Sequence, residues 1–348
     1  MNTEEQWEDF IRIIIRAFVI IFICMGYLYG ITTALLFGIN PSIIGKLKTK
    51  ALQQQIATAI GYFFLSLIIF FVTFTQNMHD FQNGNVFKIL SISFISGFFM
   101  GIGSFLQYKA LNYLGTSNGF ALSTASILVF NGIFSVLIFQ DWKTIGALSL
   151  GFGSIFLIIF GAFLVSKAQS NAIEDLNANS KTDKRKKMII GIIIVILEGL
   201  AFSVNTLSPK FLLNDNVSPY TLILPQAVGY VIATFIIAVI IFFIGLSKKQ
   251  KDPEYKNEVF FDKRTIPATI VGILGCAANL FLIFSNKEIG TAISNSLSQL
   301  CVSFSTVLAL IILKEYKGKT KKEVILMVLG AFVVAMGGVA IGFTSLLN

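Results

Sequence analysis

Long apolar stretches separated by short polar breaks run along almost the whole chain. Ten of them approach the roughly 20 residues that a helix needs to cross a bilayer. They cover about residues 18–38, 55–75, 88–108, 117–139, 144–166, 188–207, 219–246, 266–285, 290–313 and 323–346. Because several breaks are only a few residues long, most neighbouring helices are expected to pack antiparallel. The pattern predicts an all-α integral membrane protein with ten transmembrane helices.

The composition narrows the class of protein further. Of the 348 residues, 55% are hydrophobic and 13% are charged, whereas soluble domains have about 25% charged residues. A soluble chain would also have to bury 35 phenylalanine side chains. These numbers exclude an ordinary cytosolic enzyme. The net charge of +9 comes from basic residues in the breaks between apolar stretches, which favours a role in membrane topology over nucleic-acid binding.

The polar breaks divide the chain into four parts. Residues 1–17 form an acidic N-terminal extension, 18–166 a first set of five helices, 167–187 a polar linker, and 188–346 a second set of five helices. The linker ends in the basic run Lys184 to Lys187. We expect this run to fix topology, and binding of anionic lipid is the alternative.

The distribution of lysine and arginine predicts the orientation in the membrane. The side shared by both termini carries six of the 27 basic residues, which are Arg12, Arg16, Lys88, Lys143, Lys210 and Lys287. The other 21 lie in the breaks after the first, third, fifth, seventh and ninth stretches. Since cytoplasmic loops carry the excess of basic residues, both termini are expected to be extracellular in the cell membrane.

The two sets of five helices share several small-residue positions. At an offset of about 175 residues, Gly115-Thr116 matches Gly290-Thr291, and Gly97 matches Gly272. Further matches are Leu122-Ser123 with Leu297-Ser298, Gly61-Tyr62 with Gly229-Tyr230, Gly30 with Gly199, Gly153 with Gly330, and Gly161 with Gly338. Five is an odd number, so two consecutive repeats of five helices must have opposite orientations. Inverted repeats are typical of secondary transporters.

Uncharged polar side chains gather at membrane depth in a few of the stretches. Such side chains are costly in lipid unless they face other helices or a wet cavity. The candidates for a central cavity are Gln107, Ser123, Gln226, Asn279, Asn295, Ser298 and Gln299. Amides and hydroxyls both donate and accept hydrogen bonds, which suits a neutral, hydroxyl-rich solute. The alternative for each residue is a role in packing or bridging helices.

Two ionisable side chains also fall in or at the end of apolar stretches. Glu198 lies well inside the stretch 188–207, where a charged carboxylate costs about 3 kcal/mol on insertion scales. It is a candidate for proton coupling, and a structural acid bonded to a neighbouring helix is the alternative. Lys109 follows Gln107 at a helix end. It either contacts substrate or extends to the membrane interface.

Other chemistry finds little support. The chain has one histidine, His79, and its three cysteines, Cys24, Cys276 and Cys301, lie in apolar stretches without paired spacing. We therefore expect neither a metal nor another cofactor. There is no GxxxxGK[ST] phosphate-binding loop. The acidic residues are scattered over the polar breaks, which argues against a membrane-embedded transferase that binds a metal-diphosphate.

Several stretches resemble the glucose/ribose uptake family of bacterial sugar transporters, in the drug/metabolite transporter superfamily. They are Gly103 to Ala110 with Gly115-Thr116-Ser117 and Ser123-Thr124, then Pro225 to Gly229, Asn279 to Phe281, Ser296 to Gln299 and Lys319 to Glu323. The resemblance covers about residues 20–345. Two positions depart from it, with Tyr29-Gly30 where the family has a Trp-Gly pair and Glu198-Gly199 where it has a Gly-Tyr pattern.

The resemblance implies ten helices in two inverted repeats, and uptake of a monosaccharide such as glucose or ribose with a proton gradient. Sodium is the alternative coupling ion. By matching position, the resemblance also implies substrate contact for Gln107, Lys109, Gln226, Asn279, Ser298 and Gln299. Export of a neutral metabolite or amino acid on the same fold is the alternative function, and the residues alone do not separate the two.

Overall fold

The computed structural model describes the backbone of residues 3–138, 140, 142–172, 181–213, 217–251, 263–314, 320–344 and 347. Every element in these ranges is a helix. Eight of the helices are long and apolar enough to cross a membrane, and two shorter apolar helical stretches accompany them at Asn118–Phe134 and Cys301–Ile312. The expectation of an all-helical integral membrane protein is confirmed. Side chains before Met25, and most of the predicted linker 167–187, lie outside the described residues.

The first half of the chain forms six helices. They are α1 (Thr3–Leu47), α2 (Ala51–Val72), α3 (Phe74–Asn83), α4 (Val86–Leu114), α5 (Thr116–Leu137) and α6 (Ile145–Ala172). The second half forms α7 (Lys181–Leu207), the short α8 (Lys210–Leu213), α9 (Pro219–Lys251), α10 (Thr265–Ile289), α11 (Thr291–Ser298), α12 (Cys301–Ile312) and α13 (Lys321–Phe343).

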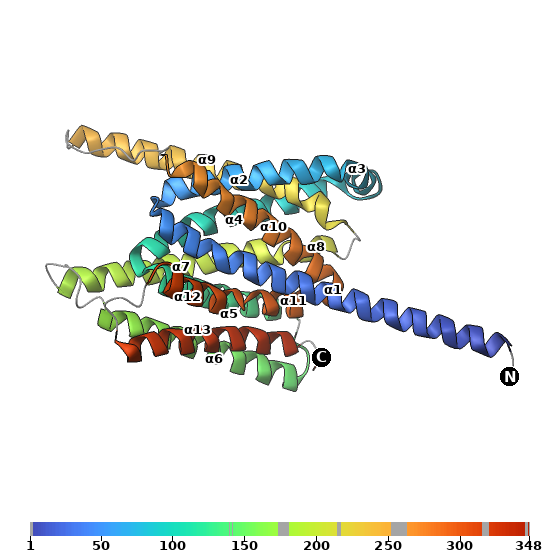
Figure 1. The fold of residues 1–348 in the computed structure, drawn as a ribbon. Coiled ribbons are helices and arrows are strands. Elements are labelled where there is room, and N and C mark those ends of the chain that lie inside the picture. The colour runs from blue at the N-terminus through green and yellow to red at the C-terminus, as the bar shows by residue number, and fades with distance from the viewer. Residues whose placement is uncertain are drawn as a thin grey trace.

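The first helix is longer than the predicted stretch. α1 continues without a break from Thr3 to Leu47, so it extends beyond both ends of the stretch 18–38. Its contacts with the bundle extend from Gly26, beside Ile289 of α10, to Gly45, beside Leu313 and Thr116. The N-terminal part of the helix projects from the bundle (Figure 1).

The predicted stretch 290–313 is not one helix. α11 ends at Ser298 and α12 begins at Cys301, with a turn at Gln299 and Leu300 between them. Two short helices were also missed: α3, because most of its residues are polar, and α8, because it has only four residues. α3 is tied to α9, since Asp80 accepts hydrogen bonds from the Ser218 amide (2.8 Å) and the Thr221 hydroxyl (2.6 Å) at the start of that helix.

Glycines allow two pairs of helices to cross with their backbones in contact. A methyl group on Gly97 of α4 would collide with the Gln226 carbonyl of α9, and one on Gly229 with the Phe94 carbonyl. In the same way, Gly61 of α2 faces Thr269 of α10, and Gly272 faces Thr58. These crossings, with the packing of α2 on α9, hold α2, α4, α9 and α10 together as one group of helices.

The remaining helices complete the bundle around this core. α1 packs on α10, α11 and α12, while α7 packs on α4 and α5. α6 and α13 form a pair at one side of the molecule (Figure 1). Large apolar side chains such as Phe156, Phe235 and Phe332 are exposed on the outside, as expected for helices that face lipid.

Candidate functional site

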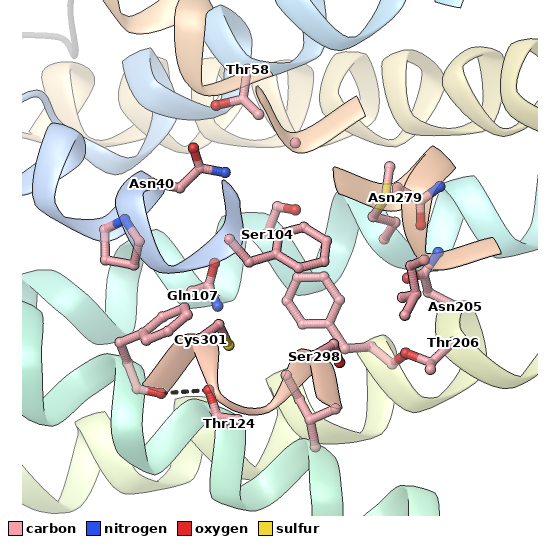
Figure 2. Close-up of a pocket in the computed structure, with 18 of the residues that line it drawn as sticks. Asn40, Thr58, Ser104, Gln107, Thr124, Asn205, Thr206, Asn279, Ser298 and Cys301 are labelled. Carbon is pink, nitrogen blue, oxygen red and sulfur yellow. Dashed lines mark hydrogen bonds between the residues drawn. The ribbon is translucent and has the colours of Figure 1, made fainter. Parts of the chain in front are cut away.

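A cavity of about 170 Å³ lies at the centre of the bundle. Its walls come from α1, α2, α4, α5, α7, α9, α10, α11, the turn after α11 and the start of α12, and no described residue of α6 or α13 lines it. Figure 2 shows amide and hydroxyl side chains from several of these helices around the same space. The polar lining consists of Asn40, Thr58, Tyr62, Ser104, Gln107, Tyr108, Thr124, Asn131, Asn205, Thr206, Tyr230, Asn279, Asn295, Ser298 and Gln299.

No charged side chain lines this cavity among the residues that the structure describes. The lining combines uncharged hydrogen-bonding groups with aromatic rings, including Tyr62, Tyr108 and Tyr230. Tyr62 and Tyr230 lie edge to face with ring centroids 5.5 Å apart. A solute in this space would meet donors, acceptors and apolar ring faces but no fixed ionic partner.

Five of the residues singled out in the sequence line the cavity: Gln107, Asn279, Asn295, Ser298 and Gln299. The last three come from the end of α11 and the turn after it. Ser298 donates a hydrogen bond to the Asn295 carbonyl (2.7 Å), and Gln299 donates to the same carbonyl (3.0 Å). The end of α11 therefore arranges these side chains locally.

Gln226 does not line the cavity but lies behind two residues that do. Its side-chain oxygen accepts hydrogen bonds from the Asn279 amide (2.7 Å) and the Tyr62 hydroxyl (3.2 Å), and its amide donates to Ser96 (2.8 Å). The Asn279 amide also donates to Tyr62 (2.9 Å). Gln226 thus fixes the positions of two lining side chains.

Ser96 extends this group of hydrogen bonds to α7. The Asn205 amide donates to the Ser96 hydroxyl (3.0 Å), which in turn donates to the Asn205 carbonyl (3.0 Å). We refer to Tyr62, Ser96, Asn205, Gln226 and Asn279 as the amide network. Each member makes at least two hydrogen bonds within the protein, and together they join α2, α4, α7, α9 and α10.

Glu198 is fully buried beside the cavity rather than in it. One carboxyl oxygen accepts a hydrogen bond from Ser123 of α5 (2.7 Å), and the other accepts one from Gln107 of α4 (3.1 Å). Both of these described partners are neutral side chains. Because Gln107 also lines the cavity, it links the acid to that space.

Lys109 does not line the cavity, although its neighbour Tyr108 does. Its ammonium group lies 4.9 Å from the centre of the Phe105 ring, one turn earlier in α4. This is the geometry of a cation–π contact. The lysine side chain therefore packs on its own helix, five residues before α4 ends at Leu114.

Several residues that line the cavity were not among the site residues predicted from the sequence. Asn40 lies beyond the predicted stretch 18–38, in the part of α1 that continues to Leu47, and it lines the cavity. Asn131 and Asn205 stand in apolar stretches and carry the same signal as the predicted amides. Polarity at membrane depth could have found both, but it could not separate cavity residues from helix-bridging ones.

The described residues contain no group of three or more His, Cys, Asp or Glu side chains that could hold a metal ion. Cys276 and Cys301 are free thiols in buried positions, and Cys301 contributes to the cavity wall.

Comparison with known proteins assigns this architecture to a family. Residues 28–344 match the family described as Sugar transport protein. The chain belongs to the sugar transport protein family. The resemblance found in the sequence is confirmed, and the family assignment indicates a membrane transporter rather than an enzyme.

Relatives within the family cover nearly the whole chain. A protein of Listeria monocytogenes named for an inferred role in sugar uptake, lmo0169, is 32% identical over 91% of this chain and 99% of its own length. The glucose uptake protein GlcU of Bacillus subtilis is 28% identical over 91% of this chain and 98% of its own.

A likeness to a solved structure concerns the fold alone. One crystal structure has a TM-score of 0.53 with 12% sequence identity, over 93% of this chain and 99% of that one.

Proposed function

We propose that this chain takes up a monosaccharide of the glucose or ribose class by alternating access around the central cavity. The observation that carries the proposal is the cavity itself, with uncharged amides, hydroxyls and tyrosine rings at membrane depth. A hydroxyl-rich neutral solute matches such a lining. The names of the relatives lmo0169 and GlcU, which mention sugar and glucose uptake, point the same way.

Alternating access would rest on ten transmembrane helices in two inverted repeats. In this arrangement α5 is the fourth span, and α11 with α12 forms the ninth. Backbone conformation supports the repeat, since Gly115 (φ 78°) and Gly290 (φ 83°) each have a left-handed conformation immediately before a threonine. Gln140 (φ 52°) and Lys314 (φ 54°) form a second matched pair of residues with positive φ, near the ends of α5 and α12.

The helix crossings support the same repeat. The α2–α10 crossing at Gly61 and Gly272 corresponds to the α9–α4 crossing at Gly229 and Gly97. These are the glycines that match between the two halves of the sequence. Likewise, Gly30 of α1 packs on Leu297 of α11, while its counterpart Gly199 of α7 packs on Ser126 of α5.

We propose that substrate contacts Gln107, Asn279, Asn295, Ser298 and Gln299 directly, because all five line the cavity. Gln226 would act through Asn279 and Tyr62, which it holds. Ser123 would act through Glu198. For Lys109, stacked on Phe105, we propose an interfacial role next to the cavity rather than a contact with the sugar.

We further propose that Glu198 couples uptake to a proton gradient. A buried carboxylate with neutral partners alone is expensive, whereas the protonated acid is not. The described partners of Glu198 are the neutral side chains of Ser123 and Gln107. Through Gln107, protonation of the acid can change the hydrogen bonds offered to the cavity.

For the orientation in the cell membrane, we propose that the loops rich in lysine and arginine face the cytoplasm and that both termini are extracellular.

The test is uptake of labelled glucose and ribose into proteoliposomes, with and without an imposed pH gradient. We expect one of the sugars to accumulate above its equilibrium level only with the gradient. Glu198→Gln should lose this accumulation and retain counterflow. Accumulation driven by sodium alone would overturn the proton proposal, and the absence of counterflow with any sugar would overturn sugar transport.

An amino acid is the main competing substrate. Its ammonium and carboxylate groups would require charged or strongly polarised partners, and no described charged side chain lines the cavity. Counterflow with a panel of neutral amino acids provides the comparison. Exchange of an amino acid without exchange of any sugar would favour that alternative.

A further inference from the structure

Three asparagines in the cavity wall stand apart from the other amides. The side-chain oxygens of Asn40, Asn131 and Asn295 are buried, and no described protein group donates a hydrogen bond to any of them. All three residues line the central cavity. A buried acceptor without a donor costs about 1–3 kcal/mol, so these positions are costly unless something in the cavity supplies donors.

From this contrast we infer that Asn40, Asn131 and Asn295 form the acceptor set that recognises the hydroxyl groups of the substrate. The inference rests on the proposed function and makes it more specific. It separates the amides that bind substrate from those of the amide network, which already bond to one another.

The three asparagines come from separate helices. Asn40 lies on α1, Asn131 on α5 and Asn295 on α11. α1 and α11 are in contact, since Gly30 packs against Leu297, while α5 contributes from the first half together with α1. A single small solute that bonds to all three would therefore tie the second half of the chain to the first.

The chemistry of the acceptors defines the substrate more narrowly than polarity does. A free amide oxygen needs a donor, and a sugar hydroxyl can donate to it. A carbon that carries hydrogen in place of the hydroxyl cannot donate, and neither can one that carries fluorine. The set therefore selects sugars by their donating hydroxyls rather than by overall size or shape.

The test measures binding of glucose and its deoxy and fluorodeoxy analogues to the full-length protein in proteoliposomes, by competition in counterflow. In the wild type, we expect at least one deoxy analogue to bind about tenfold more weakly, which corresponds to about 1.4 kcal/mol. The fluorodeoxy analogue of the same position should be equally weak, because fluorine does not donate.

Asn40→Ala, Asn131→Ala and Asn295→Ala are then compared with the same analogues. Each variant should bind glucose about tenfold more weakly and should no longer distinguish glucose from the deoxy analogue of one position. A loss of affinity with discrimination unchanged would indicate a structural effect and would overturn the assignment of that residue.

Asn286→Ala provides the matched control. Asn286 of α10 is also buried, and its side-chain oxygen also lacks a donor, but it does not line the cavity. This variant should bind glucose and its analogues like the wild type. An equal loss in Asn286→Ala would show that any buried asparagine has the same effect, and the inference would fail.

The two proposals fail in different ways. If the wild type exchanges no sugar, the proposed function is wrong. If the wild type exchanges sugar while all three variants keep wild-type affinity and discrimination, the function stands and the acceptor set is wrong.

Discussion

Two groups of amides lie close together in the bundle and use the same chemistry differently. In the amide network, Gln226 makes three hydrogen bonds to the protein, and its partners bond to each other. On the cavity wall, Asn40 and Asn131 each hold an oxygen without a protein donor. The polar side chains of the bundle are thus of two kinds. Those of the amide network bond helices to one another, and the cavity asparagines have an oxygen that no protein group uses.

The comparison implies that the two groups should respond differently to substitution. Removing a member of the amide network leaves its neighbours without a hydrogen-bond partner. Removing a cavity asparagine takes away an oxygen that had no protein donor in the first place. Protein stability should therefore distinguish them, and the four substitutions below run from the largest expected loss to the smallest.

The helix crossing behind the amide network should be the most sensitive point. In Gly97→Ala, the new methyl group meets the backbone of Gln226, so α4 and α9 must separate. We expect a loss of more than about 3 kcal/mol, at the upper end for overpacking. The measurement is the thermal unfolding midpoint in detergent, together with the yield of monodisperse protein.

Gly153→Ala is the matched control, because nothing lies within 4 Å of a methyl group at Gly153 of α6. It should unfold like the wild type. If both variants have the same midpoint, the close crossing of α4 and α9 is not required for stability.

Gln226→Leu should follow with a loss of about 3 kcal/mol. The substitution leaves the Asn279 amide, the Tyr62 hydroxyl and the Ser96 hydroxyl each without one partner, and each unmet buried group costs about 1–3 kcal/mol. Neighbours that rearrange to bond among themselves would reduce the sum. The same unfolding measurement applies, and a midpoint at or above that of the wild type would contradict the structural role of the network.

Tyr62→Phe removes a single hydroxyl from the same network. Asn279 and Gln226 keep their mutual bond (2.7 Å), so we expect a loss of about 1 kcal/mol. Ring contact with Tyr230 should persist, since both rings remain. An effect as large as that of Gln226→Leu would indicate that the hydroxyl, and not the amide, organises the network.

Asn131→Leu should cause no loss of stability, and a gain is expected because the unpaired buried oxygen costs about 1–3 kcal/mol. The substitution removes an oxygen that has no protein donor, and the leucine side chain has a similar size. Thermal unfolding without sugar checks this expectation. A loss like that of Gln226→Leu would show that Asn131 bonds to the protein after all and would remove the distinction between the two groups.

The unfolding midpoint measured with and without sugar tests whether the cavity asparagines bind the substrate. A sugar that binds the folded protein raises its unfolding midpoint. Variants of the cavity asparagines should lose this shift without a fall in the midpoint measured without sugar.

The candidate residues show where sequence reasoning stops. Gln107, Asn279 and Gln299 were predicted for the cavity from polarity alone, and they line it. Gln226 carries the same signal but lies behind Asn279, because the face that a residue presents depends on how its helix crosses its neighbours. Asn40 was missed, since the predicted stretch ended at residue 38 while α1 continues to Leu47.

The sequence by itself determined the all-helical membrane class, most of the helices and the family, because hydropathy and local motifs are properties of adjacent residues. It also supplied the matched glycines of the two halves. Only the tertiary structure decided which of these glycines meet at crossings, which acid bonds to Gln107, and which amides are already paired. Those facts depend on contacts between residues far apart in the chain, and a hydrogen bond such as the one from Asn279 to Gln226 exists only once α9 and α10 have packed.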